Sequence, residues 1–396
     1  MFECAARYNG LLESRPDVDF IFFDAGGGHR AAATALEAVA RREERAWNIR
    51  LVDLQDVLDE LDIFRKLTGL RLEDIYNRLL ENGWTLGSTQ LLPLMHGVIR
   101  LYHSAQVRVL AKYWGARPPA MVVSLVPNFS RSQWQALQRV DPKIPFVTIL
   151  TDMADYPPSF WIERQKQIFI CGTDRAVAQV REISPESTAH RVSGMILNPK
   201  FYDVAPADRA AERRELGLDP TKPTGLVLFG GMGSDKMENI LKRIDESSLD
   251  VQLVLICGKN EKLRNRLEAR TTRILKFVEG FTKDIPRYMQ LVDFFIGKPG
   301  PGSISEAIQM GLPVIVEKNS WTLPQERFNA DWVTENNVGE SLTSFHGIVP
   351  ALERLLKPAR LAECQANAAA IRNNAVFEIT AILDTILECA SRPASS

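Results

Sequence analysis

Short apolar runs alternate with helix-length segments along most of the chain. In the first half, these runs cover residues 20–23, 50–52, 121–123, 146–150 and 167–170. They are apolar throughout rather than at every second position, which is typical of strands covered on both faces. Segments with a helical pattern lie between them, for example residues 30–46 and 130–139. The alternation predicts an α/β domain built on a parallel, doubly wound sheet.

The same pattern restarts after a polar, proline-containing stretch at residues 198–208, with apolar runs at 225–229, 251–256, 293–296 and 313–316. A chain of 396 residues exceeds one ordinary core, so we expect two Rossmann-like domains. We predict an N-terminal domain over residues 1–198 and a C-terminal domain over 199–374. A final helix within 375–396 is expected to pack back on the first domain. Facing sheets of this kind hold ligands in the crevice between them.

Composition narrows the class of protein. Hydrophobic residues make up 45% and charged residues 24%, and the net charge of -1 gives no electrostatic case for binding nucleic acid. The five cysteines lack paired spacing, which is typical of reduced thiols in a cytosolic protein. The sequence contains no His/Cys cluster, so we expect no structural metal. We find no signal peptide and no apolar run of about 20 residues, so we expect a protein that is soluble or bound to a membrane only at its surface.

Three glycines follow the first predicted strand, in Gly26-Gly27-Gly28-His29-Arg30, and an alanine-rich helix follows directly. Glycines allow the backbone to approach a ligand closely, and the first N–H groups of a helix bind anions. The imidazole of His29, which titrates near neutral pH, is suited to removing a proton from a hydroxyl. Taken alone, however, this motif is more typical of a tight turn with a capping histidine.

Two further glycine turns follow strands of the second domain, at residues 230–234 and 298–303. In the latter, backbone N–H groups and the Ser303 hydroxyl are suited to a diphosphate, and Glu306 to the two hydroxyls of a ribose. The alternatives are plain tight turns and an acid that complements the helix dipole. Residues 321–330 add an amide beside a carboxylate, which suits sugar hydroxyls but is more often solvated surface. Three glycine turns in successive α/β domains together predict a sugar-nucleotide cleft.

These segments resemble glycosyltransferase family 28, in the group of monogalactosyldiacylglycerol synthases and bacterial processive diacylglycerol glucosyltransferases. The signature consists of G-G-G-H-R, then K-x-G-P-G-[ST]-x-x-E, then P-Q-E-x-x-N. The resemblance implies a GT-B fold and an inverting enzyme that moves a hexosyl group from a UDP-sugar to a lipid hydroxyl, of diacylglycerol or a glycolipid. It implies no metal and no cofactor, since the UDP-sugar is a co-substrate.

The resemblance also implies roles for individual residues. His29 matches the histidine that activates the acceptor, and Asp152 is a partner of His29 or of the acceptor. In the donor-binding set, Phe281 and Ile285 hold the uracil, and Glu306 binds the ribose. The loop around the donor sugar contains Pro324, Gln325 and Glu326. The loops that contact the diphosphate contain Gly231, Met232, Gly300, Gly302 and Ser303, and Gly28 completes the set. The sequence departs from the family at Asn198, where an arginine often approaches the phosphate. Lys200 nearby could replace its charge but not its bidentate geometry.

Residues 82–140 contain no Asp or Glu, although 49 acids in 396 residues would place about seven there. Basic and large apolar residues lie together in this segment, which suits adsorption to anionic headgroups. The alternative is that the apolar residues form a helical core. The candidates for contact with a membrane or acceptor are Trp84, Arg100, Arg108, Lys112 and Trp114. With the resemblance, they predict a cytoplasmic protein on the inner face of the cell membrane.

Two other functions fit the same architecture. A non-hydrolysing sugar-nucleotide 2-epimerase would need several acids around the sugar, and the sequence presents no such cluster beside the glycine turns. A non-catalytic sensor of sugar nucleotide or lipid would be consistent with the missing arginine.

Overall fold

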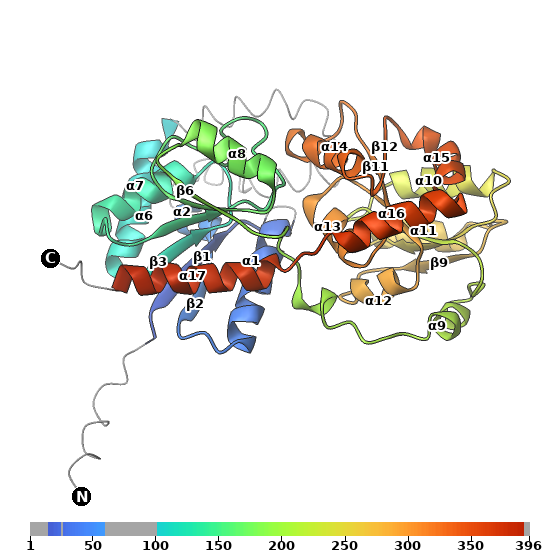
Figure 1. The fold of residues 1–396 in the computed structure, drawn as a ribbon, viewed down its shortest axis with the longest axis horizontal. Coiled ribbons are helices and arrows are strands. Elements are labelled where there is room, and N and C mark those ends of the chain that lie inside the picture. Colours follow the sequence, from blue (N-terminus) through green and yellow to red (C-terminus); the bar gives the residue numbers. More distant parts are fainter. Residues whose placement is uncertain (1–14, 25–26, 60–100, 392–396) are drawn as a thin grey trace, which may run out of the picture.

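The computed structural model describes residues 15–24, 27–59 and 101–391, which form two α/β domains lying side by side (Figure 1). The first domain has a six-stranded parallel sheet in the order β2-β1-β3-β4-β5-β6. Its strands are β1 (Asp17–Phe22), β2 (Asn48–Asp53), β3 (Met121–Ser124), β4 (Phe146–Ile149), β5 (Ile168–Cys171) and β6 (Thr188–Arg191).

The second domain repeats this plan with the order β12-β11-β10-β7-β8-β9, again all parallel. Its strands are β7 (Thr224–Leu228), β8 (Gln252–Ile256), β9 (Lys276–Glu279), β10 (Phe294–Gly297), β11 (Val314–Glu317) and β12 (Gly339–Leu342). The predicted pair of doubly wound sheets is therefore confirmed. The apolar runs missed β6, β9 and β12, which are edge strands with mostly half-buried or exposed residues.

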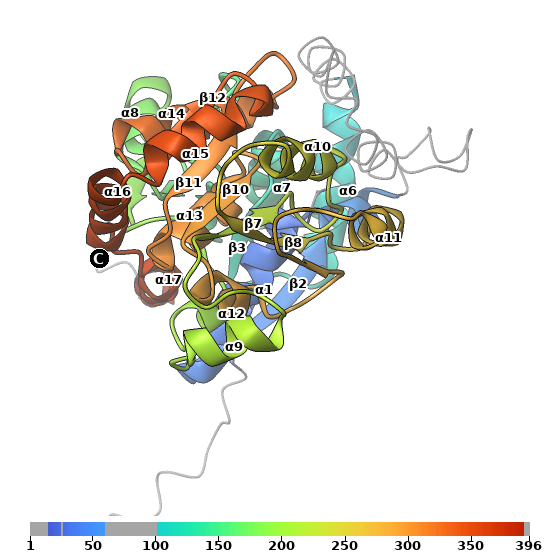
Figure 2. The same cartoon turned by 90° about the vertical axis from the view of Figure 1, so that its right-hand side faces the viewer.

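Helices cover both faces of each sheet because neighbouring residues of a strand point to opposite sides. Phe20 of β1 faces a core shared with α1 and α17, whereas Ile21 faces α6 and α7. In the second domain, α12, α13 and α14 cover one face, and α10, α11 and α15 cover the other (Figure 2). The helices are α1 (Gly28–Arg42), α2 (Leu54–Leu58), α6 (His103–Ala116), α7 (Ser130–Val140), α8 (Asp174–Ile183), η2 (Pro199–Phe201), α9 (Arg209–Glu215), α10 (Lys236–Asp245), α11 (Glu261–Ala269), α12 (Ile285–Gln290), α13 (Pro301–Gln309), η3 (Pro324–Glu326), α14 (Arg327–Glu335), η4 (Phe345–Gly347), α15 (Ile348–Leu355), α16 (Pro358–Ala370) and α17 (Ala375–Ser391).

The last helix crosses back from the second domain and packs against α1 of the first (Figure 1). Its buried residues Val376, Ile379 and Leu383 join the core beneath β1. The carboxylate of Asp384 accepts a hydrogen bond of 2.5 Å from the Trp47 indole. Two chain connections thus join the domains, one through η2 and one through the segment before α17.

The glycine turns lie at the topological switch point of each sheet, where the order in which successive strands are added changes direction. In the first sheet, this switch point lies between β1 and β3, and in the second it lies between β7 and β10. Ligands of open α/β sheets bind outside the carboxyl ends of strands at such points. The turn after β1 and those after β7 and β10 therefore occupy the ligand-binding edges of their sheets.

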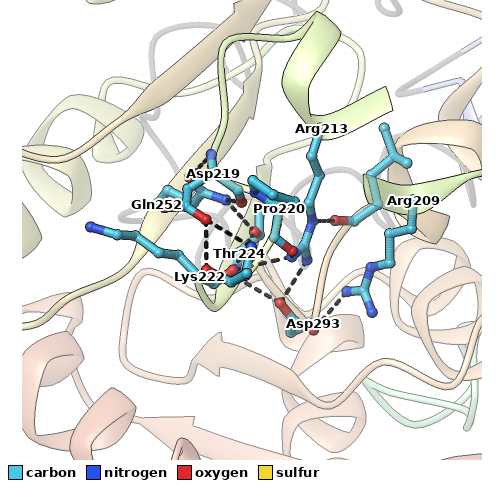
Figure 3. Close-up of polar contacts among 10 residues, drawn as sticks. Arg209, Arg213, Asp219, Pro220, Lys222, Thr224, Gln252 and Asp293 are labelled. Atoms are coloured by element: carbon cyan, nitrogen blue, oxygen red, sulfur yellow. Dashed lines mark hydrogen bonds and ion pairs between the residues drawn. The ribbon is translucent and has the colours of Figure 1, made fainter. Parts of the chain in front are cut away.

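At the amino ends of β7 and β10, a polar network joins α9 to the sheet (Figure 3). The guanidinium of Arg213, which is 3% exposed, donates to the carbonyl oxygens of Leu291, Pro220 and Lys222. It also donates to Oδ2 of Asp293 over 2.8 Å, and the same oxygen accepts the backbone N–H of Thr224. The network fixes the starts of the two strands whose other ends carry glycine turns.

The structure corrects one of the membrane candidates. Trp114 is fully buried in the core between α6, α7 and the sheet, and its indole donates to Asp19 over 3.0 Å. Arg108 and Lys112 are exposed, one turn apart on α6. Trp84 and Arg100 lie outside the described residues. Among the helices of the described ranges, none combines the length and apolarity needed to span a bilayer.

Candidate active site

The first glycine turn leaves space at the start of α1. Gly27 has a φ of 77°, which glycine adopts without strain, and α1 begins at Gly28 with no side-chain cap. Apart from its chain neighbours and the backbone of its own helix, no heavy atom of the described structure lies within 4 Å of the point where a Cβ of Gly28 would stand. The described structure therefore leaves room beside the uncapped start of this helix, where N–H groups could bind an anion. Gly26 lies outside the described residues.

His29, the second residue of α1, is held against the loops that follow β3 and β4. Its Nδ1 lies 3.1 Å from the Thr151 hydroxyl, and its ring centroid lies 6.0 Å from that of Trp161. Burial lowers the pKa of the imidazole to about 4, against the smaller opposing effect of a hydrogen bond to the backbone of Leu125. The imidazole is therefore neutral at physiological pH and can accept a proton.

Asp152 lies beside this histidine but has a different partner. Its Oδ2 accepts a hydrogen bond of 2.9 Å from the indole N–H of Trp161, so the side chain that pairs with His29 is Thr151, not Asp152. Burial, with a smaller contribution from the negative charge of Glu326, raises the pKa of the Asp152 carboxyl to about 7. Asp152 therefore faces the second domain.

The glycines in the two turns of the second domain have two different roles. Gly230 and Gly233 have φ values of 75° and 62°, and a Cβ on Gly233 would lie 2.6 Å from the Cys257 carbonyl oxygen. The fold itself therefore requires these two. At Gly231 and Gly302, in contrast, the described structure leaves the Cβ position open and φ is not positive. Their lack of side chains leaves room beside the turns into α10 and α13.

The other predicted donor residues surround these turns. Met232 is 41% exposed, and Ser303 lies in the first turn of α13, after Gly300. Removal from solvent raises the pKa of Glu306, one turn further along, to about 7. The ring of Phe281, which is 54% exposed, lies 5.7 Å from the ammonium of Lys259, and Ile285 begins α12 after the same loop.

The loop before α14 packs against the turn before α13 rather than standing as solvated surface. Glu326 is 7% exposed, whereas Pro324 and Gln325 are half-buried in the same 3-10 turn. Asn329 is fully buried, and its Nδ2 donates to the Pro299 carbonyl oxygen over 2.9 Å. This bond ties the loop to the turn before α13.

Sequence reasoning missed three residues of this site. Lys298 Nζ lies 2.8 Å from Glu326 Oε1, while Thr151 and Trp161 hold His29 and Asp152. Lys298 belongs to the K-x-G-P-G motif, so the motif itself was the available signal. Thr151 adjoins Asp152, but the position of Trp161 depends on the path of its loop and carries no such signal.

Charged and aromatic contacts cross between the domains. The carboxyl of Asp152 interacts electrostatically with Lys298 and Glu326. Tyr156, from the first domain, lies with its ring centroid 6.0 Å from that of Phe328 in α14. A cavity of about 400 Å³ adjoins this contact, between Thr173 and Arg175 of one domain and Trp332 of the other, and no predicted donor residue lines it.

Within the described ranges, no group of three or more His, Cys, Asp and Glu side chains could hold a metal ion. At the position of the missing arginine, Asn198 Oδ1 accepts the backbone N–H of Lys200, whose side chain is exposed.

Comparisons with known proteins show which families the sequence resembles. Residues 226–344 match the glycosyltransferase family 28 C-terminal domain. Monogalactosyldiacylglycerol synthase 1, chloroplastic, from Arabidopsis thaliana is 28% identical over 84% of this chain and 63% of its own length. The spinach (Spinacia oleracea) enzyme, monogalactosyldiacylglycerol synthase, chloroplastic, is also 28% identical, over 95% of this chain and 73% of its own.

Among solved structures, MurG from Acinetobacter baumannii shares the fold, with a TM-score of 0.59, 11% identity, and coverage of 93% of this chain and 99% of that one. The structural neighbours show the GT-B fold. The family 28 match and the synthase relatives show that the protein is a glycosyltransferase. Its second domain carries the family 28 module, as the motifs predict, and its resemblance to monogalactosyldiacylglycerol synthases extends over most of the chain.

Proposed function

We propose that this enzyme transfers a hexosyl group from a UDP-sugar to a lipid hydroxyl, of diacylglycerol or a glycolipid, with inversion at the anomeric carbon. The observation that carries the proposal is the neutral imidazole of His29, which lies at the ligand-binding edge of the first sheet. The open glycine turns of the second sheet lie at the corresponding edge of the other domain. We infer the lipid acceptor from the names of the relatives, which are monogalactosyldiacylglycerol synthases.

The reaction is a direct displacement. His29 takes the proton of the acceptor hydroxyl while the hydroxyl oxygen forms its bond to the anomeric carbon. The bond from that carbon to the β-phosphate oxygen breaks, and its electron pair leaves with UDP. Because attack and departure occur on opposite sides, the configuration inverts. The free N–H groups at the turns into α10 and α13 stabilise the charge that develops on the diphosphate.

The acceptor would reach the cleft from a membrane surface. Arg108 and Lys112 of α6 and Arg131 and Arg139 of α7 are exposed basic side chains of the acid-free segment. Such side chains are attracted to anionic headgroups. We propose that the protein binds the cytoplasmic face of the cell membrane peripherally through this region.

Incubating the protein with a panel of UDP-sugars and a lipid extract tests the proposal directly. We expect mass spectrometry to detect a lipid that has gained one hexosyl residue, together with stoichiometric UDP. UDP binding without transfer to any lipid would instead support a sensor. Conversion of the UDP-sugar into its epimer without an acceptor would support a 2-epimerase.

Donor binding should also depend on pH through Glu306. The carboxyl has a pKa raised to about 7, and only its ionised form can accept two hydroxyl hydrogen bonds from the ribose. Binding therefore favours the ionised form, so the affinity for uridine should rise about tenfold between about pH 6 and 8 and level off above. Uridine is the suitable probe because it lacks titrating phosphates. Calorimetry on Glu306→Gln should give weaker binding without this pH dependence; a retained dependence would exclude Glu306 as its source.

A further inference from the structure

Lys298 lies where the two glycine turns of the second domain approach each other. It directly follows β10, which pairs with β7 at the switch point of the sheet. Its Cε lies 3.3 Å from the point where a Cβ of Gly300 would stand, and 3.8 Å from the corresponding point of Gly230. The lysine stem therefore lies between the turn after β7 and the turn before α13.

The ammonium group of Lys298 is surrounded by acids from both domains. Its Nζ lies 2.8 Å from Oε1 of Glu326, and it interacts electrostatically with the buried carboxyl of Asp152. The Lys298 side chain is nevertheless 42% exposed, in contrast to 9% for that of Glu326. An exposed ammonium beside an anion-binding turn can change its partner without entering the core.

The proposed reaction creates a need for positive charge at this place. As the glycosidic bond breaks, the diphosphate gains a negative charge, and the arginine position of related sequences is occupied by Asn198, whose side chain caps η2. Lys236, at the start of α10, is paired with Glu317, and Lys259 lies over the Phe281 ring. Lys298 is also paired, with Glu326, but its side chain lies between the two glycine turns.

We propose that Lys298 leaves Glu326 when the donor binds and pairs with the diphosphate, so that it neutralises the departing UDP. This inference rests on the proposed function. The exchange frees the Glu326 carboxylate to accept hydrogen bonds from hydroxyls of the donor sugar. Lys298 keeps its proton throughout, since the acceptor proton goes to His29 and the electron pair of the broken bond stays on the β-phosphate oxygen. The lysine thus takes the place of a metal ion in balancing charge.

Calorimetry with uridine, UMP and UDP tests this assignment, because the three ligands differ only in phosphate. In Lys298→Met we expect UDP affinity to fall at least about tenfold, while uridine affinity stays within about twofold. Lys298→Arg should restore most of the UDP affinity. In transfer assays, Lys298→Met should lower kcat at least about a hundredfold, because the charge on the diphosphate is largest in the transition state.

Glu326→Gln separates this role from a purely structural one. UDP lacks the donor hexose that Glu326 would bind, so Glu326→Gln should leave UDP affinity unchanged or raise it. If Lys298 served only to hold Glu326, both substitutions would weaken UDP binding alike, and that result would overturn the inference. Lys222→Met is the matched control, since Lys222 pairs with Asp250 over 2.7 Å just before β7 starts, at the opposite edge of the sheet. Unchanged UDP affinity in Lys298→Met would contradict the inference, even if the enzyme transfers hexose. A wild-type protein that binds UDP but transfers no hexose would contradict only the proposed function.

Discussion

Replacing His29 by alanine should lower the rate of hexosyl transfer by about a hundredfold to ten-thousandfold while UDP affinity stays within about twofold. The imidazole is the acceptor-side base in the proposed reaction, whereas the donor contacts come chiefly from the second domain. The substitution removes the base without touching the turns into α10 and α13. Steady-state kinetics with saturating donor, combined with calorimetric UDP binding, measures both quantities on one preparation.

The pH profile gives this prediction a second readout. Burial holds the pKa of His29 at about 4, so the base is already neutral at mildly acidic pH. The acid limb of kcat/KM for the acceptor, measured with saturating donor, should therefore lie near pH 4 rather than near the ordinary histidine value of about 6.5. His29→Ala should lose this limb together with the activity.

Two outcomes would contradict the assignment of His29. Unchanged turnover in His29→Ala would show that another group takes the proton. Equal losses in His29→Ala and in a control, His190→Ala, would point to general damage to the domain. His190 is suited to this comparison because it lies on the edge strand β6 of the same sheet.

Apart from the edge strand β2, the strands that the sequence predicted are almost entirely buried. Residues 224–228 and 252–256 are buried throughout, so their apolar runs are visible without any knowledge of the fold. The edge strands β6 and β12 read Thr-Ala-His-Arg and Gly-Glu-Ser-Leu. Their strand character comes from pairing with one neighbour, which no local pattern reports.

The candidate site divides in a similar way. The glycine turns were predictable because each lies directly after a buried strand, and parallel strands bring their carboxyl ends to one edge. The pairing of His29 with Thr151 and of Lys298 with Glu326 joins residues far apart in the chain. For Trp114, the local sequence led to a wrong prediction. Its position in a segment rich in basic residues suggested contact with a membrane, but the side chain is buried in the core and donates a hydrogen bond to the buried Asp19.

Long-range polar contacts also determine how the two turns of the second domain stand relative to each other. Thr224 starts β7, and Asp293 directly precedes β10; the Thr224 N–H donates to Asp293 Oδ2 over 2.8 Å. Arg213 donates to the same carboxylate and to three carbonyl oxygens (Figure 3). One buried guanidinium thus fixes the amino ends of the two strands whose carboxyl ends carry the donor loops.

Arg213→Ala should therefore lower the free energy of unfolding by about 3–5 kcal/mol, because it leaves the Asp293 carboxylate and several carbonyl groups without their buried partner. Urea denaturation of the purified protein measures the change. Arg209→Ala is the matched control: Arg209 pairs with the other oxygen of Asp293 over 2.6 Å, but its side chain is 43% exposed. Its loss should cost less than about 1 kcal/mol. Similar effects of the two substitutions would mean that burial does not strengthen the Arg213 contacts, and that the two strand starts are held by the apolar core alone.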